Sequence, residues 1–373
     1  MRFPEFSGEW KRVELKDVAE FQKSRIPADS LDASCYISTE NLIPNFGGIK
    51  EASSIPTDGN VMAIKPNDIL ISNIRPYLKK VWQSDRFGGC SADVFVLRTT
   101  RCQSDFLYNI IASDKFINYA MSGAKGVKMP RGDKRQMEEF EFSIPAIEEQ
   151  NRISRLLSLL DERIATQNKI IEDLKKLKSA IIEIEYSPKD SYHSHIGGAI
   201  VQISKRNKDN HLCNVLSVSN RQGFIKQSEQ FEDRNVASDD TSNYKIVEKN
   251  DFAYNPARIN VGSIARLTKF ETGIVSPMYI CFRTKDCLLP EYLELFFESR
   301  NFFYHIQKRL EGSVRLCLSY EELCNIPIVI PSIEKQKQVD LHLSKLAQKI
   351  DLEMKILQFV QQQKTYLLHQ MFI

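Results

Sequence analysis

The sequence lacks several features that define large protein classes. It contains no apolar run approaching the roughly 18 residues that a membrane helix needs, and no apolar segment follows its N-terminus. Its eight cysteines include no CxxC pair. Scattered cysteines in a chain of 373 residues predict reduced, mostly buried thiols. We therefore expect a cytoplasmic protein that does not bind a membrane.

The common signatures of catalysis are also missing. There is no GxGxxG or Walker phosphate loop, no HExxH zinc helix and no GxSxG elbow. The tetrapeptide NPAR at residues 255–258 resembles the Asn/Asp-Pro-Pro-aromatic signature of amino-methyltransferases, but it lacks the second proline and the aromatic residue. We predict no catalytic residues and no bound metal. A zinc site sketched from the histidines matches no strong spacing, and it would have to use His193, His195, His211 and Cys213.

Neither sign of charge predominates, because 51 basic and 48 acidic residues give a net charge of only +3. Hydrophobic residues make up 42% and charged residues 27%, which is typical of folded globular proteins. A length of 373 residues allows two or three domains. Local clustering of basic residues, rather than global charge, must therefore decide whether the chain binds nucleic acid.

What the sequence does contain is an internal repeat. The segment IPAIEEQ at 144–150 returns as IPSIEKQ at 330–336, and each copy opens a long helical stretch. Upstream, KPNDILISNIR at 65–75 matches EKNDFAYNPAR at 248–258, each with an Asn-Asp turn, a short strand and a polar loop ending in arginine. The repeat predicts a globule, a helix, a second globule and a second helix. The corresponding boundaries are 1–143, 144–186, 187–329 and 330–373.

Both globules mix the two kinds of secondary structure. Runs typical of strands occur at 69–71, 94–97 and 278–282, and helical stretches are predicted at 106–121 and 290–309. We therefore predict an α+β fold for each globule.

The two helical stretches share a heptad seam. Apolar residues recur in steps of four and three, as in a coiled coil. Two such stripes are expected to bury each other, and an intrachain two-fold arrangement requires antiparallel helices. Our proposed register pairs Lys178 with Glu353, and Gln167 with Lys364. The predicted seam comprises Leu160, Ile164, Ile171, Leu174, Lys178, Ile181, Leu346, Ile350, Glu353, Leu357, Val360 and Leu367.

Basic and polar residues gather in loops that follow the predicted strands. Arginine suits bidentate contact with guanine, asparagine with adenine, and lysine contact with phosphate. Equivalent placement favours Arg75 and Arg258, although a scaffold role, pairing with Asp68 and Asp251, is an alternative. The candidate DNA-binding residues are Ser72, Asn73, Arg75, Tyr77, Lys79, Lys80, Lys125, Lys128, Arg131, Asn255, Arg258, Asn260, Arg309, Ser313 and Arg315.

This layout resembles the specificity subunit of type I restriction–modification systems. The repeated IPxIExQ motif and heptad helices carry the resemblance, together with the opening GEWKRVELKDV at residues 8–18. It covers nearly the whole chain, but the segment HIGGAI at 195–200 departs from the expected opening of the second globule.

The resemblance implies a function for each part. Each globule would be a target-recognition domain reading half of a bipartite site in double-stranded DNA. Two modification subunits carrying S-adenosylmethionine would dock along the helices, and restriction subunits would use ATP and Mg. The chain itself would bind no cofactor. The alternative is a non-catalytic scaffold with two protein-binding globules on a coiled-coil spacer.

Overall fold

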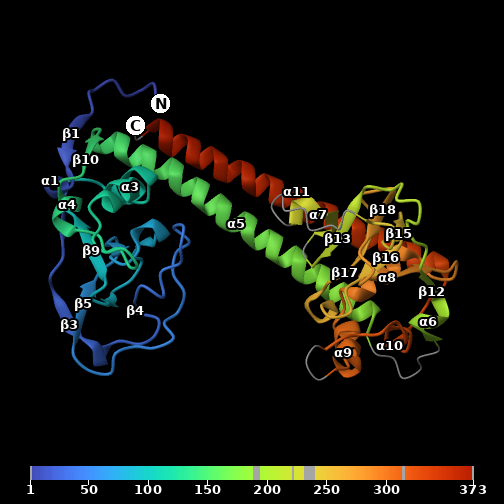
Figure 1. Cartoon of the computed structure of the whole chain (residues 1–373). Helices are drawn as coiled ribbons and strands as arrows, with labels where there is room; N and C mark the ends of the chain where they lie inside the picture. Colours follow the sequence, from blue (N-terminus) through green and yellow to red (C-terminus); the bar gives the residue numbers. More distant parts are fainter. Residues whose placement is uncertain (1, 188–193, 221, 231–239, 313–315, 372–373) are drawn as a thin grey trace. The chain divides into compact units, whose positions relative to one another are not determined.

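The computed structural model describes residues 2–187, 194–220, 222–230, 240–312 and 316–371 (Figure 1). The chain forms two compact units. The first comprises Met1–Asn168 and Lys355–Ile373, and the second comprises Lys169–Met354. Each unit therefore holds one globule and a part of both long helices. Among the described residues, no helix combines the length and apolar character that crossing a membrane requires.

The first globule is built from short strands and helices. Its strands are β1 (Lys11–Glu14), β2 (Ala19–Phe21), β3 (Arg25–Pro27), β4 (Tyr36–Ile37), β5 (Asn60–Ile64), β6 (Ile69–Ser72), β7 (Val81–Gln83), β8 (Gly88–Cys90), β9 (Val94–Thr99) and β10 (Glu141–Ile144). Its helices are α1 (Leu15–Val18), α2 (Ser104–Ile111), α3 (Asp114–Ser122) and α4 (Lys134–Glu138), with 3-10 turns η1 (Ala28–Ser30) and η2 (Pro76–Leu78).

The second globule repeats this order of elements. Its strands are β11 (Ser194–His195), β12 (Ile200–Ile203), β13 (Val215–Ser219), β14 (Gly223–Lys226), β15 (Lys245–Glu248), β16 (Phe252–Tyr254), β17 (Ile264–Arg266), β18 (Thr272–Val275), β19 (Ile280–Thr284) and β20 (Pro327–Ile328). Its helices are α6 (Ile196–Ala199), α7 (Gln227–Gln230), α8 (Pro290–Phe297), α9 (Arg300–Arg309) and α10 (Tyr320–Cys324), with η3 (Ile259–Val261).

The strand pairing shows that the duplication extends through the globules. One sheet has the order β2-β9-β6-β7 in the first globule and β12-β19-β16-β17 in the second. A second sheet has the order β5-β8-β4 in the first globule and β15-β18-β13 in the second. In both globules the last two of these strands are parallel, β8 with β4 and β18 with β13. Only its edge strand differs, since β3 joins β5 whereas β14 joins β13. The predicted α+β fold with an internal repeat is confirmed.

The opening of the second globule, which the sequence left uncertain, corresponds to that of the first. Strand β1 pairs with β10 and leads into α1, just as β11 pairs with β20 and leads into α6. Leu15 and Ile196 begin the two short helices, and their amides donate to the carbonyls of Phe140 and Ile326. Both side chains are fully buried.

The helical stretches predicted at 106–121 and 290–309 are each two helices. The break falls at Ser113 in the first copy and at Ser299 in the second. Each serine caps the following helix, because its hydroxyl accepts a hydrogen bond from the amide of Phe116 or Phe302, respectively. The single-helix prediction was wrong, since the apolar period continues across a capped corner.

A buried aspartate fixes the turn before each central strand. Asp68 is 1% exposed, and its carboxylate accepts from the Lys65 amide at 2.8 Å. Arg98 on β9 donates to both its oxygens at 2.7 Å. Asp251 binds Arg283 in the same manner in the second globule. The alternative in which Asp68 and Asp251 pair with Arg75 and Arg258 is therefore wrong.

The repeated glutamine of IPxIExQ ties each long helix to its globule. These helices are α5 (Ile147–Glu185) and α11 (Ile333–Met371). Gln150 is buried and accepts from the Gln103 amide at 2.9 Å, while Gln336 accepts from the Leu289 amide at 2.8 Å. Residues 103 and 289 are the N-caps of α2 and α8. The motif thus supplies a partner for a part-buried amide at the start of each helix.

Within each unit the segments of α5 and α11 pack side by side. Leu157 and Leu160 share a core with Val360 and Leu367 in the first unit. The last turns of α5 share the core of the second unit with the first turns of α11. The helices therefore run antiparallel, as predicted. All twelve predicted seam residues are buried or partly buried.

The two lysines of the seam form ion pairs that the heptad pattern did not predict. Lys178 donates to Glu298 of the globule at 2.6 Å. Lys364 contacts Asp161 at 2.5 Å. The register that pairs Lys178 with Glu353 and Gln167 with Lys364 stays a prediction. Long lysine side chains reach carboxylates beside the seam, and heptad spacing alone does not reveal those neighbours.

Candidate nucleic-acid interface

The two basic loops predicted in the first globule lie together. The amide of Arg75 donates to the carbonyl of Pro130 at 2.8 Å, and the amide of Gly132 donates to the carbonyl of Asn73 at 3.0 Å. Lys125 and Arg131 pair as a hairpin through two backbone hydrogen bonds of 2.9 Å. The loop after β6 and this hairpin therefore form one surface.

The second globule brings the equivalent loops together. The amide of Leu318 donates to the carbonyl of Pro256 at 3.1 Å, so the loop after β16 contacts the segment that follows the second hairpin. Glu311 and Cys317 pair at the base of that hairpin, as Lys125 and Arg131 do in the first. The predicted residues Ser313 and Arg315 lie outside the described residues.

Arg75 and Arg258 lie at exposed positions of these loops. Both are exposed, and within the described residues neither guanidinium has a hydrogen bond or an ion pair. Arg75 adopts a left-handed backbone conformation with φ of 51°. Such a conformation costs a non-glycine residue roughly 1 kcal/mol, and it persists only where the surrounding structure imposes it. Here the Pro130 hydrogen bond holds the Arg75 backbone in place.

Several other candidate cations already have carboxylate partners. Lys79 contacts Asp114 at 2.6 Å, Lys125 contacts Asp133 at 2.8 Å, and Arg131 contacts Asp93 at 2.8 Å. The last two pairs are largely exposed, and exposed pairs contribute about 0–1 kcal/mol. Their cations can therefore exchange a carboxylate for a phosphate at low cost.

Four candidates have structural roles in the described chain. Ser72 and Asn255 are buried, and each bonds its own loop backbone, so the fold argues against direct contact with a base. Lys80 donates to the Thr39 carbonyl, and burial together with nearby Lys50 lowers the pKa of its ammonium group. Arg309 donates to backbone carbonyls of His305 and Asn325.

The candidates that remain accessible surround the two arginines. Tyr77 is 48% exposed on η2, directly after Arg75 and Pro76. Lys128 is exposed on the first hairpin, and Asn73 and Asn260 are partly exposed in their loops. Arginine, asparagine and tyrosine on rigidly held loops are the side chains that read base edges in a groove.

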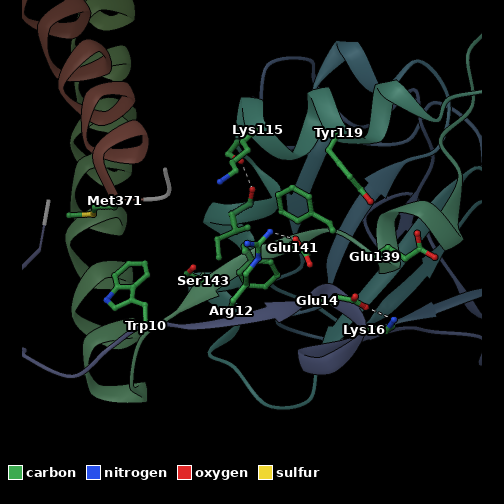
Figure 2. A pocket seen from close by; sticks show the side chains of 14 residues that line it. Trp10, Arg12, Glu14, Lys16, Lys115, Tyr119, Glu139, Glu141, Ser143 and Met371 are labelled. Carbon is green, nitrogen blue, oxygen red and sulfur yellow. Dashed lines mark hydrogen bonds and ion pairs between the residues drawn. The ribbon is translucent and has the colours of Figure 1, made fainter.

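One cavity of the first unit is unlike a nucleic-acid site. It has a volume of about 910 Å³. It is bordered by the β1–β10 ribbon, α3 and the end of α11 (Figure 2). Glu14, Glu139 and Glu141 line it, and Arg12 and Lys16 pair with two of these carboxylates. The lining carries as many cations as carboxylates, Lys115 included, so its charge gives phosphate no net attraction and we place no DNA contact there.

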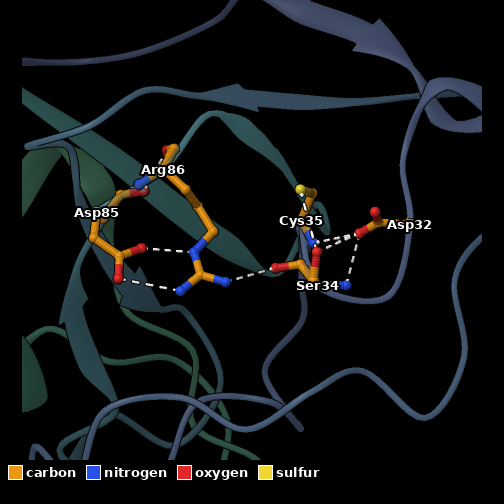
Figure 3. A network of polar contacts seen from close by, with 6 residues as sticks. Asp32, Ser34, Cys35, Asp85 and Arg86 are labelled. Atoms are coloured by element: carbon orange, nitrogen blue, oxygen red, sulfur yellow. Dashed lines mark hydrogen bonds and ion pairs between the residues drawn. The ribbon is translucent and has the colours of Figure 1, made fainter.

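A polar network stabilises the far end of the first globule (Figure 3). Arg86 donates to the carboxylate of Asp85 and, at 3.0 Å, to the carbonyl of Ser34. Asp32 accepts from the amide and the hydroxyl of Ser34, and these hydrogen bonds lower the pKa of its carboxyl group. The network joins the turn before β4 to the β7–β8 connection. Its arginine, Arg86, is held by these hydrogen bonds, unlike the exposed Arg75.

The described residues contain no group of three or more His, Cys, Asp or Glu side chains positioned to hold a metal ion. Of the residues considered for zinc, His193 lies outside the described residues. Cys213 is exposed and its thiol lies near the carbonyl of His211.

Comparison with known proteins finds relatives for this arrangement. Residues 7–176 match the model of the type I restriction modification DNA specificity domain. The chain is 26% identical over 188 residues to the type I restriction enzyme MjaVIII specificity subunit of Methanocaldococcus jannaschii, covering 49% of this chain and 42% of that protein. It is 26% identical over 166 residues to the EcoDI specificity subunit of Escherichia coli, covering 42% and 36%. The chain thus spans less than half the length of these relatives.

The first half of the chain thus matches the type I restriction modification DNA specificity domain. The likeness of fold extends beyond this matched segment. The type I S subunit from M. genitalium superimposes with a TM-score of 0.60 at 15% identity, covering 98% of this chain and 96% of that one. A chain from a structure of type I complex assembly and conformational transition gives 0.57 at 16% identity, covering 96% of each. These likenesses show that the specificity-family fold continues through the second globule.

Proposed function

We propose that this chain is the DNA-reading subunit of a type I restriction–modification complex. Each globule binds one half of a bipartite, asymmetric target in double-stranded DNA, and the helix pair sets the gap between the halves. The observation that carries the proposal is the repeated loop surface. An exposed arginine with no partner among the described residues follows the same central strand in both copies.

The surrounding fold supports a reading role for these loops. Each loop follows a strand whose entry turn is fixed by a buried Asp–Arg pair, Asp68–Arg98 or Asp251–Arg283. Rigid support keeps an arginine side chain in a limited set of positions, which bidentate contact with guanine requires. The two loops differ in sequence, so they are suited to different half-sites.

The helix pair offers docking surfaces for the modification subunits. Outside the seam, α5 and α11 expose large apolar side chains that include Ile184 at 74% and Phe359 at 70%. Several of them recur in heptad steps, which places them on one face of each helix. The exposed residues are Leu159, Ile170, Leu177, Ile184, Leu341, Leu352, Phe359 and Tyr366.

The chemistry of the complex resides on its other subunits in this proposal. Two modification subunits bring S-adenosylmethionine, and restriction subunits bring ATP and Mg. This chain selects the DNA sequence on which the complex acts, and it does not catalyse a reaction. Its exposed arginines and lysines contribute charge and hydrogen bonds to DNA, for which no cofactor is needed.

The test uses the complex of this chain with its modification subunits. Genomic DNA fragments are bound at 50 mM and 200 mM salt, and the bound sequences are read. If six or more phosphates are contacted, affinity falls by about 10³-fold or more between these concentrations. Enrichment of one bipartite motif supports the proposal. Retention of DNA without any motif, or no retention at low salt, favours the scaffold with two protein-binding globules.

A further inference from the structure

Helices α3 and α9 are counterparts in the duplication. Ser113 and Ser299 cap them and are 186 residues apart (299 − 113), the same separation as Ile147 and Ile333, which begin the long helices. Each packs against the 3-10 turn that follows the exposed arginine, α3 against η2 and α9 against η3. They therefore occupy equivalent places beside the two candidate reading loops.

Their exposed faces differ in charge and in aromatic content. At three matching positions, one turn apart, α3 carries Asp114, Asn118 and Ser122. The same positions of α9 carry Arg300, Tyr304 and Lys308, all exposed. Tyr304 is 53% exposed and adjoins Phe303, which is 49% exposed. At these three positions, α9 thus carries a basic and aromatic stripe, whereas α3 carries no cation and no aromatic ring.

The cations of this stripe are available to a ligand. Within the described residues, neither Arg300 nor Lys308 forms an ion pair with a carboxylate. The Lys308 ammonium lies 4.3 Å from the centre of the Tyr304 ring, a cation–π contact that holds both side chains on the surface. In the first globule, Asp114 instead neutralises the loop cation Lys79 at 2.6 Å.

The stripe sits on a firmly held helix. Phe302 and Ile306 on the opposite face are each 2% exposed, and the Phe302 ring packs on Phe297 with centroids 4.6 Å apart. The amide of Arg300 donates to the carboxylate of Glu183 on α5 at 3.0 Å. The exposed aromatic side chains therefore do not turn inward to complete a core that is already packed.

We propose that the exposed face of α9 binds DNA directly, contacting backbone phosphates and deoxyriboses beside the half-site that the second globule reads. This inference rests on the proposed DNA-reading function. Arginine and lysine bind phosphate, and flat aromatic rings lie against sugars. A modification subunit docking on repeated elements would find its surface on both α3 and α9. A face present on one copy only fits an asymmetric ligand, and the bipartite target is asymmetric.

The test uses the complete complex with modification subunits and a duplex that carries the mapped target with 20 or more flanking base pairs on each side. The variant Arg300→Ala/Lys308→Ala removes two phosphate contacts. The slope of log affinity against log salt then becomes shallower by about 1.8, and affinity falls roughly tenfold at low salt. The hydroxyl-radical footprint shortens only beside the second half-site, and the methylated sequence is unchanged.

Two matched variants serve as controls. Asn118→Ala/Ser122→Ala changes equivalent, uncharged positions of α3 and leaves the slope and both footprint edges as they are. Arg300→Lys/Lys308→Arg keeps both charges, and it retains the salt slope. Co-purification with the modification subunits and thermal unfolding are measured for every variant, so that misfolding is detected separately.

Three results would overturn the inference. An unchanged slope and footprint in Arg300→Ala/Lys308→Ala would show that this face does not touch DNA. Loss of modification subunits from the folded variant would show that it docks protein. Equal shortening of the footprint at both half-sites would show a global effect. If the wild-type complex itself binds no DNA, the proposed function fails first, and that failure is recognisable before any variant is compared.

Discussion

Asp251 and Arg283 form a two-pronged ion pair at the start of the central strand of the second globule. Arg283 Nε donates to Oδ1 at 2.6 Å and Nη2 to Oδ2 at 2.9 Å, while the aspartate is 1% exposed. A carboxylate at such depth is stable only when it is fully hydrogen-bonded. Asp68 and Arg98 repeat the pair in the first globule, so both reading loops start from the same anchored turn.

Removing the arginine should therefore destabilise the second unit. We expect Arg283→Ala to lower the free energy of unfolding by about 2 kcal/mol, below the range for fully buried pairs because Arg283 is half-exposed. Urea unfolding measures the loss. Lys249→Ala removes an exposed pair with Glu271 as a control and should change stability by less than about 0.5 kcal/mol. Equal losses in the two variants would contradict a special role for the Asp251 pair.

Replacing Gln336 should also destabilise the fold, although its side chain is uncharged. Its amide group accepts from the Leu289 amide and donates to the carbonyls of Cys287 and Pro331 at 3.0 and 2.9 Å. The variant Gln336→Leu keeps the volume but removes three hydrogen bonds to part-buried backbone groups, which costs about 1–2 kcal/mol. Gln362→Leu, at an exposed site of α11, is the control. Hydrogen exchange measures the protection of the Leu289 amide, which should fall in Gln336→Leu. Unchanged protection would show that Gln336 does not hold this amide.

The contact between Asp161 and Lys364 predicts a charge-reversal pattern. Lys364→Glu places two carboxylates together and should destabilise the first unit by about 1 kcal/mol. Asp161→Lys/Lys364→Glu restores an opposite-charge pair, and we expect it to recover most of that loss. The coupling energy from the double-mutant cycle is the measurement. Additive effects would mean that the two side chains do not interact.

The long helices were predictable because their information is local and periodic. Heptad spacing placed Leu160, Ile171, Ile350 and Val360 on the buried face directly from the order of residues. The ion pairs of Lys178 and Lys364 were not predictable, since their carboxylates are distant in sequence or displaced from the seam. The same limit explains why the partner of Asp68 was missed, because Arg98 is 30 residues away.

In the candidate site, too, some features follow from the sequence and others depend on tertiary packing. Repeated position alone singled out Arg75 and Arg258, and both are exposed. Burial of Ser72 and Asn255 followed from tertiary packing, which a polar residue type does not disclose. Arg300, Tyr304 and Lys308 were missed because their significance depends on aligning α9 with α3, and the apolar period had merged each of these helices with its neighbour.

Methylation mapping reads the target of each globule. The chain, or a variant, is expressed with its modification subunits, and methylated sites are read across genomic DNA. We expect a bipartite motif in which Arg75→Ala relaxes one half and Arg258→Ala relaxes the other, each with a loss of about 1–3 kcal/mol in discrimination at the affected base. A change in both halves from either variant, or a motif untouched by both, would contradict this expectation.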